Sequence, residues 1–88
     1  PWQDVRDEFE GESDILSVID ALEGAGAPVP DVDRIGEEVA GYPTLLIWGD
    51  AALLEDPPED AKPFVDQGIH PYTLDEVDDL ISHLTKEK

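Results

Sequence analysis

The 88-residue sequence contains no cysteine and no methionine, and it has only five basic residues against 23 acidic ones. Without cysteine, the chain has no disulfide, no thiol nucleophile and no thiolate ligand for a metal. The formal net charge of −18 repels phosphate backbones and anionic lipids, so nucleic acid and membrane surfaces are poor candidates as partners. No apolar run approaches the roughly 20 residues that a membrane span needs.

A chain of this length buries a modest fraction of its unfolded surface, so residues 1–88 are expected to form a single small domain. The sequence does not begin with methionine, and the stretch from Pro1 to Asp4 lacks the basic start and apolar core of a signal peptide. We therefore expect an N-terminally incomplete domain, derived from a longer polypeptide.

Apolar periodicity predicts a short helix and then a strand in the first third of the chain. Trp2, Val5 and Phe9 recur at i, i+3 and i+7, on one side of a helix. The run from Asp14 to Asp20 is rich in β-branched residues and has polar ends, which predicts a buried strand. Glycines and prolines predict a loop over residues 24–30.

The middle of the chain contains the clearest strand pattern. Asp31 fits the N-cap of a second short helix that runs to about Ala40. The apolar run from Thr44 to Trp48 predicts a strand that is covered on both faces. Residues 50–62 then form an exposed connection, in which Leu53-Leu54 is either a small edge element or a loop anchor.

The last third predicts a weak strand and a strong helix. Pro63 to Gln67 suits an edge strand, because proline cannot donate to a ladder. Thr73 and Glu76 have the spacing of a capping box. The apolar stripe that follows consists of Leu74, Val77, Leu80, Ile81 and Leu84. A strand, a connecting helix and another strand form a parallel crossover, so the order of elements predicts an α/β sandwich: a mixed sheet with helices packed on both faces.

The segment from Gly41 to Ile47, GYPTLLI, resembles the part of thioredoxin-like domains, especially of the protein disulfide isomerase branch, in which a cis-proline starts the strand beside the active site. Other segments line up in family order: the first helix resembles the end of the helix after the catalytic motif, residues 14–20 the next strand, and the helix from Thr73 the closing helix. The resemblance covers the C-terminal two-thirds of the family's domain. It implies a partial thioredoxin-like sandwich and favours the endoplasmic reticulum or another organellar lumen, whereas the net charge also fits a halophile.

The family's CxxC motif and central strand would both lie before Pro1. An alternative register matches Pro1-Trp2 to the tryptophan before that motif, but it leaves too few residues to complete the helix. By resemblance, Gly41, Tyr42, Pro43 and Thr44 form the binding site. If the Tyr42–Pro43 bond is cis, the backbone of Tyr42 is free to pair with an extended client. The alternative is that Pro43 starts a strand in trans.

Three functions follow from these patterns. The first is a redox-inactive thioredoxin-like domain that serves as a protein-interaction or structural subunit, with a protein partner or a missing segment of the same polypeptide filling the place of the absent strand. The second is the C-terminal fragment of a disulfide isomerase-type oxidoreductase, whose CxxC lies upstream of residue 1. The third is an acidic, calcium-buffering module that binds divalent cations weakly.

Other candidate chemistry fails on the residues themselves. The segment from Asp31 to Gly36 begins like a calcium loop, but Ile35 and Tyr42 occupy positions that require oxygen ligands. His70 and His83 are far apart in the sequence and share no ligand spacing. The sequence therefore predicts no catalytic residue, no metal site and no cofactor.

Overall fold

The computed structural model describes residues 2–85, and its centre is a three-stranded sheet in the order β3-β4-β5. β3 (Leu46–Ile47) pairs antiparallel with β4 (Ala51–Leu54), and β4 pairs parallel with β5 (His70–Thr73). Helix α3 (Lys62–Asp66) lies between the two parallel strands in the chain. The radius of gyration of 12.0 Å matches the value of about 12 Å for a compact chain of this length. The fold is a compact α/β arrangement with a mixed sheet.

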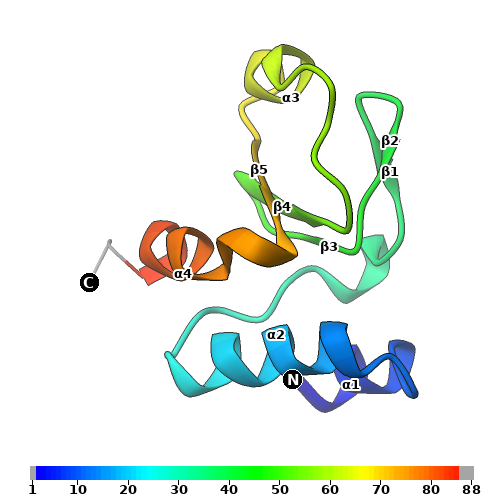
Figure 1. Ribbon diagram of the computed structural model, residues 1–88, viewed down its shortest axis with the longest axis vertical. Coiled ribbons are helices and arrows are strands. Elements are labelled where there is room, and N and C mark those ends of the chain that lie inside the picture. Colours follow the sequence, from blue (N-terminus) through cyan, green and yellow to red (C-terminus); the bar gives the residue numbers. More distant parts are fainter. Residues whose placement is uncertain (1, 86–88) are drawn as a thin grey trace.

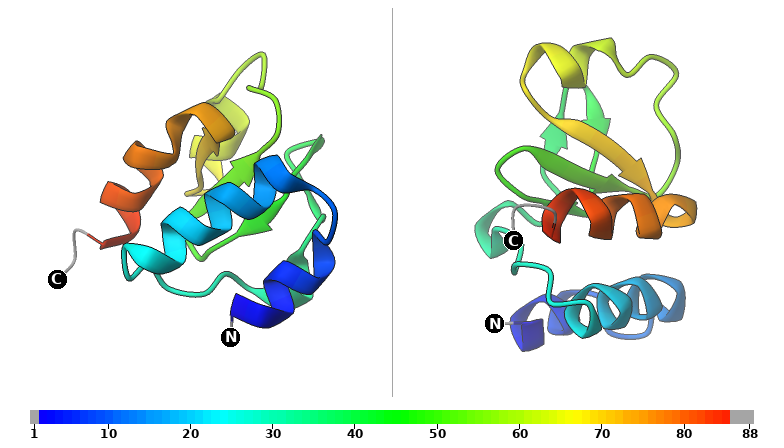
Figure 2. Two further views of the ribbon diagram at one scale, coloured as in Figure 1. Left: turned by 60° about the horizontal axis from the view of Figure 1, so that its bottom comes forward. Right: turned by 90° about the vertical axis from the view of Figure 1, so that its left-hand side faces the viewer.

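Two layers cover this sheet (Figures 1 and 2). On one side lie the helices α1 (Trp2–Glu8), α2 (Ser13–Gly24) and α4 (Val77–Thr85). On the other side lie α3 and a hairpin of β1 (Glu38–Val39) and β2 (Tyr42–Pro43). Two 3₁₀ turns, η1 (Val32–Arg34) and η2 (Leu74–Glu76), complete the regular elements of residues 2–85. Helices pack on both faces of the sheet, as the sequence predicts.

The strands divide their side chains between two apolar cores, because successive residues of a strand point to opposite faces. Leu46 and Leu53 belong to the core on the helical side, whereas Ile47 and Leu54 belong to the core beneath α3 and the hairpin. None of these four side chains is more than 1% exposed. The prediction that the strand around residues 44–48 is covered on both faces is confirmed.

The predicted strand from Asp14 to Asp20 is wrong, because this segment lies inside helix α2. Ile15, Val18, Ile19 and Leu22 are the buried residues of α2, and their spacing of three or four is that of a helix. Seven residues that contain Ile15, Val18 and Ile19 between polar ends fit a short strand and a buried helix equally well. Over twelve residues, the alternation of buried and exposed positions follows the helical period.

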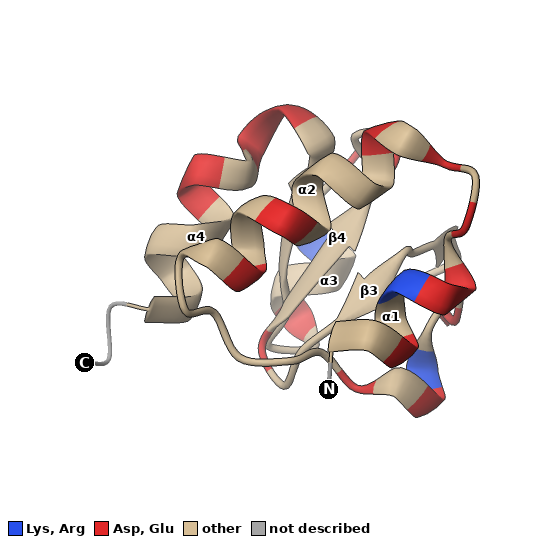
Figure 3. Ribbon diagram, turned by 90° about the horizontal axis from the view of Figure 1, so that it is seen from below, with Lys and Arg blue, Asp and Glu red and all other residues tan. Residues whose placement is uncertain are grey.

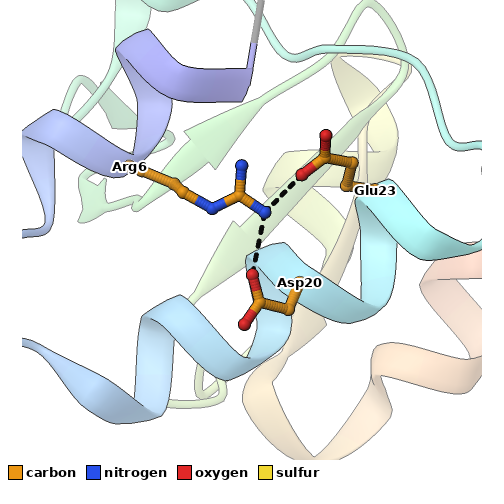
Figure 4. Close-up of polar contacts among 3 residues, drawn as sticks. All are labelled: Arg6, Asp20 and Glu23. Atoms are coloured by element: carbon orange, nitrogen blue, oxygen red, sulfur yellow. Dashed lines mark hydrogen bonds and ion pairs between the residues drawn. The ribbon is translucent and has the colours of Figure 1, made fainter.

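Ion pairs fasten α1 to α2 on the outer surface (Figure 4). The guanidinium of Arg6 contacts the carboxylates of Asp20, at 2.8 Å, and Glu23. These two hydrogen bonds raise the pKa of Arg6, so its charge is permanent. Both carboxylates come from α2, one turn apart, and they hold α1 against it while Trp2 and Val5 of α1 enter the core.

The predicted helix from Asp31 to Ala40 is also wrong. Asp31 does cap a helical turn, since its carboxylate accepts a hydrogen bond from the Asp33 N–H at 3.0 Å. The turn ends at Arg34, and Gly36 follows with a φ of 78°, which a helix does not tolerate. The chain then enters the hairpin strand β1.

Two predictions for the second half of the chain are also wrong. Leu53-Leu54 belongs to β4, the central strand of the sheet, not to an edge element or a loop anchor. Residues 63–67, predicted as a strand, lie mostly in helix α3, where Pro63 occupies the first turn and needs no N–H partner. Because β3, β4 and β5 are hydrogen-bonded neighbours, the sheet of residues 2–85 contains no gap where a missing strand would fit.

The closing helix is confirmed. The carboxylate of Glu76 accepts a hydrogen bond from the Thr73 N–H at 3.0 Å, as in a capping box, and a second one from the Thr73 hydroxyl at 3.3 Å. The chain passes through η2 into α4, whose Leu80 is fully buried.

Candidate functional site

The predicted binding segment lies in the β1–β2 hairpin. Val39 pairs with Tyr42, and Ala40 and Gly41 form the two-residue turn with φ values of 55° and 84°. The described residues contain no cis peptide bond, so the bond between Tyr42 and Pro43 is trans and the predicted cis bond is wrong. The backbone of Tyr42 is used for pairing within the chain and is not free for an extended client.

The side chains of this segment hold the hairpin to the rest of the fold. The Tyr42 ring packs against Phe64 of α3, with ring centroids 5.6 Å apart. The hydroxyl of buried Thr44 donates a hydrogen bond to the carbonyl of Glu37. A small hollow of about 140 Å³ lies between the segment and residues 54–57. Gly41 and Pro43 are exposed, whereas Tyr42 and Thr44 hold the hairpin to α3 and to Glu37.

The outer edge of β5 has no N–H group to offer to an added strand. The His70 N–H donates to the carbonyl of Asp50, at 2.9 Å, so the backbones of Ile69, Pro71 and Thr73 face away from β4. The Ile69 N–H donates to the carbonyl of Phe64, the Thr73 N–H donates to Glu76, and proline has none. This edge is protected against strand pairing.

The loop that precedes the hairpin covers the edge of β3. The Asp31 N–H donates to the carbonyl of Ile47 at 2.9 Å, and the Gly36 N–H donates to the carbonyl of Leu45 at 3.4 Å. On the β4 side, the Leu45 N–H donates to the carbonyl of Leu53 at 2.7 Å. Strand addition, the mode of binding that the resemblance implies, therefore finds the outward N–H groups of β5 already used and two carbonyls at the β3 edge already bonded.

A larger hollow, of about 420 Å³, lies beside the turn between β3 and β4. Three segments border it: the loop after α2, the turn between β3 and β4, and the C-terminal part of α4. Its lining includes Val29, Asp31, Trp48, Asp50, His83 and Leu84. The Trp48 indole N–H donates to the carbonyl of Pro28 at 2.8 Å and so fastens the loop to the sheet. We call this feature the Asp50 hollow.

The Asp50 hollow combines apolar walls with two carboxylates. Val29 is 41% exposed at its rim, and Val32 is equally exposed in the following turn. Asp31 and Asp50 also border the hollow, and both are exposed. This hollow combines exposed apolar side chains with carboxylates, so this region is the candidate site for a ligand or partner.

Both histidines of the sequence meet at one side of this hollow. The rings of His70 and His83 are 5.0 Å apart between centroids, and the ring of Tyr72 lies 5.8 Å from that of His83. Nε2 of His83 lies 3.1 Å from Oδ2 of Asp50, without the alignment of a hydrogen bond. Sequence reasoning missed this cluster, because the pairing of β5 with β4 and the packing of α4 bring its members together, and no spacing along the chain reveals it.

The charges around the cluster are mainly negative. Burial raises the pKa of Tyr72, and the nearby carboxylates of Asp79, Asp50 and Glu76 raise it further. Figure 3 shows acidic residues along the outer surfaces of α2 and α4, with few basic ones between them. Among residues 2–85, Arg6 is paired with carboxylates of the chain itself, so it adds little positive potential.

The cluster lacks the arrangement of a hydrolytic site. Among the described hydrogen bonds, none joins His83 to a serine or threonine hydroxyl, which a nucleophile activated by a base needs. No group of three or more His, Asp or Glu side chains within residues 2–85 has the spacing to hold a metal ion. In the same part of the chain, no helix has the length and apolarity required to cross a membrane.

Comparisons with protein-family models, with curated proteins and with solved structures found no match to this chain.

Proposed function

We propose that the chain is a non-catalytic protein-interaction domain, and that the Asp50 hollow receives a basic segment of a partner that also carries an apolar side chain. The observation that carries this proposal is the composition of the hollow. It places Val29 and Leu84 beside two carboxylates, Asp31 and Asp50, in a chain with a net charge of −18.

The net charge of the chain indicates that its partner is positively charged. The chain has 23 acidic residues and five basic ones, so most carboxylates have no basic side chain of the chain to pair with. A basic partner relieves this repulsion when it binds, and the field of the whole chain accelerates its approach. An acidic or neutral partner gains neither effect.

The hydrogen bonds at the sheet edges indicate how a partner contacts the chain. Strand addition needs unpaired backbone groups, and the outward N–H groups of β5 are already bonded or absent. The proposed partner therefore contacts side chains and not the edge of β5. Among the described residues, the large apolar side chains with the greatest exposure are Val29, Val32 and Val65, and two of these three lie at or next to the hollow.

The thioredoxin-like relationship is a separate proposal about ancestry. The features that still support this relationship are the strand after Pro43 and the closing helix. The cis bond and the strand over residues 14–20, which the resemblance also implies, are absent. The assignment to a disulfide isomerase fragment predicts that the encoded protein carries a CxxC motif upstream of Pro1, which sequencing of its gene tests. A calcium-buffering role predicts that millimolar calcium raises the melting temperature.

Binding of defined peptides tests the interaction. The probes are fluorescein-labelled octapeptides that combine two arginines with two leucines, and the control peptides carry glutamate in place of arginine. We expect anisotropy to rise with the basic probes alone, and the affinity to fall as salt is raised from about 50 to about 300 mM. Val29→Ser should weaken binding about three- to fivefold, because less apolar surface is buried.

Val65→Ser is the matched control. Val65 is 55% exposed on α3, on the opposite side of the sheet from α4, so this change removes the same methyl groups away from the hollow. Its affinity for the probes should equal that of the unmodified chain. The proposal fails if glutamate peptides bind equally well, or if Val65→Ser weakens binding as much as Val29→Ser does.

A further inference from the structure

Three rings form a group beside the Asp50 hollow. His70 and Tyr72 are two residues apart on β5, so both side chains point to the same face of the sheet, the face that the helical core covers. His83 of α4 reaches both of them, with ring centroids 5.0 Å from that of His70 and 5.8 Å from that of Tyr72. Because His83 also lines the hollow, the three rings continue the wall of the hollow onto β5.

The ring of His70 is the most accessible of the three. His70 is exposed, Tyr72 is half-buried, and the side chain of His83 is 13% exposed. The ring planes of His70 and His83 are tilted by 52°, so His83 does not cover a face of the His70 ring as a parallel ring would. His70 therefore presents an aromatic surface to solvent and is supported by His83 from the side of the core.

Carboxylates accompany this exposed ring. The His70 N–H donates to the carbonyl of Asp50 at 2.9 Å, so the two residues are neighbours across the sheet. The side chain of Asp50 is 66% exposed, and its Oδ2 atom lies 3.1 Å from Nε2 of His83, the same imidazole that His70 contacts. The exposed carboxylate of Asp79, one turn before His83 on α4, lies near Tyr72. An aromatic surface and carboxylates are thus accessible together.

This combination distinguishes between the two basic side chains that a partner can offer. The guanidinium of arginine is planar and weakly hydrated, so it stacks on a ring while its N–H groups donate to a carboxylate. The ammonium of lysine is a compact and strongly hydrated charge, which pairs with carboxylates but gains less from a ring. Carboxylates alone attract both cations, whereas carboxylates beside an exposed ring favour arginine.

We propose that the basic side chain received at the Asp50 hollow is an arginine, whose guanidinium stacks on the exposed ring of His70 and donates to the carboxylate of Asp50. This inference rests on the proposed function, because it concerns the same site and the same partner. It adds the residue that selects the cation: His70 discriminates arginine from lysine, whereas Asp50 attracts both.

A comparison of two basic peptides tests this preference without any substitution in the chain. The probes are the arginine-leucine octapeptides and matched lysine-leucine octapeptides, both labelled with fluorescein and measured by anisotropy in the same buffer. The arginine peptides should bind about two- to fivefold more tightly, as expected for one exposed contact between a cation and a ring. Equal affinities would refute the selection of arginine.

Two substitutions of His70 separate its ring from its other properties. Both keep the backbone N–H that donates to Asp50. His70→Phe retains an aromatic face and has no nitrogen that can take up a proton, so the preference for arginine should persist. His70→Leu retains apolar bulk without an aromatic face, so the two peptides should bind equally. A preference that persists in His70→Leu, or that disappears in His70→Phe, would show that the ring of His70 is not the selecting group.

Asp50→Asn tests the other half of the contact. Both peptides should bind about two- to fivefold more weakly to this variant, because each cation loses one exposed ion pair. Unchanged affinities would place the cation elsewhere and refute the contact with Asp50.

The outcomes separate this inference from the proposed function. If arginine and lysine peptides bind equally well, the hollow still receives a basic partner, and only the role of His70 is refuted. If neither basic peptide binds, the proposed function is refuted, and the selection of arginine with it.

Discussion

The turn of the hairpin gives the sharpest test of the structure, because it contains an alanine in a conformation that alanine avoids. Ala40 has a φ of 55° and is followed by Gly41 at 84°. Two consecutive positive φ values are typical of a type I′ turn, for which Asn-Gly is the favoured pair. The left-handed conformation costs a residue with a Cβ atom about 1–2 kcal/mol, and asparagine tolerates it better because its side chain bonds locally.

Replacement of Ala40 by asparagine should therefore stabilise the chain. The side chain of Ala40 is half-buried against the core beneath the hairpin, and the added amide reduces the gain somewhat. We expect Ala40→Asn to raise the free energy of unfolding by about 0.5–1 kcal/mol. Ala40→Gly relieves the same strain but loses the methyl contact and loosens the unfolded chain, so its expected change is within about 0.5 kcal/mol of zero. Gly41→Ala should cost about 1 kcal/mol or more.

Urea unfolding followed by tryptophan fluorescence measures these changes. Trp2 is 8% exposed and Trp48 is 5% exposed, so both report loss of the core. With a slope near 1 kcal/mol per molar urea, the Ala40→Asn midpoint should rise by about 0.5–1 M without a change of slope. A destabilised Ala40→Asn together with a neutral Gly41→Ala would show that residues 38–43 do not form this hairpin.

Three further changes test other parts of the fold. Phe64→Ala empties the centre of the core beneath the hairpin and should cost about 3–5 kcal/mol, so that thermal unfolding followed by circular dichroism loses much of its cooperativity. Burial, and after it the charge of Asp79, raises the pKa of Tyr72. The contribution of Tyr72 to the free energy of unfolding is therefore constant below about pH 10 and is lost as the pH rises further. Tyr72→Phe should reduce this loss of stability in melts at alkaline pH. Pro43→Ala, at an exposed position after a trans bond, should change the urea midpoint by less than about 0.5 M, whereas a large loss of stability would show that Pro43 supports the fold.

Elements with local signals were predictable from the sequence. The capping box of Thr73 and Glu76 and the apolar stripe after it depend on neighbours within four residues, and the structure reproduces both. The N-cap of Asp31 was also predictable, but the helix expected after it was not formed. A cap shows that a helical turn begins and does not determine how far the helix continues. The positive φ of Gly36 ended it.

The sheet was harder to predict because its pairing is not local. β5 contains Pro71 and lacks regular alternation of apolar residues, so no strand was expected there. It forms because Ala51 to Leu54 present a ladder to it, across a connection that includes α3. For the same reason, the contact between His70 and His83 depends on tertiary packing, and the spacing of 13 residues between them contains no signal of it.

The segment from Gly41 to Thr44 shows how one sequence fits two structures. Proline before an apolar run suits a strand that begins at a cis bond, and it suits equally the second strand of a tight hairpin. Ala40-Gly41 decides between them, because only a two-residue turn allows Val39 to pair with Tyr42. Once that turn forms, the backbone of Val39 and Tyr42 pairs within the chain. For this reason our proposed contact surface is the Asp50 hollow, whose rim consists of side chains. Contact through side chains makes binding depend on charge, which a backbone ladder does not, and a chain with 23 acidic residues is suited to that kind of recognition.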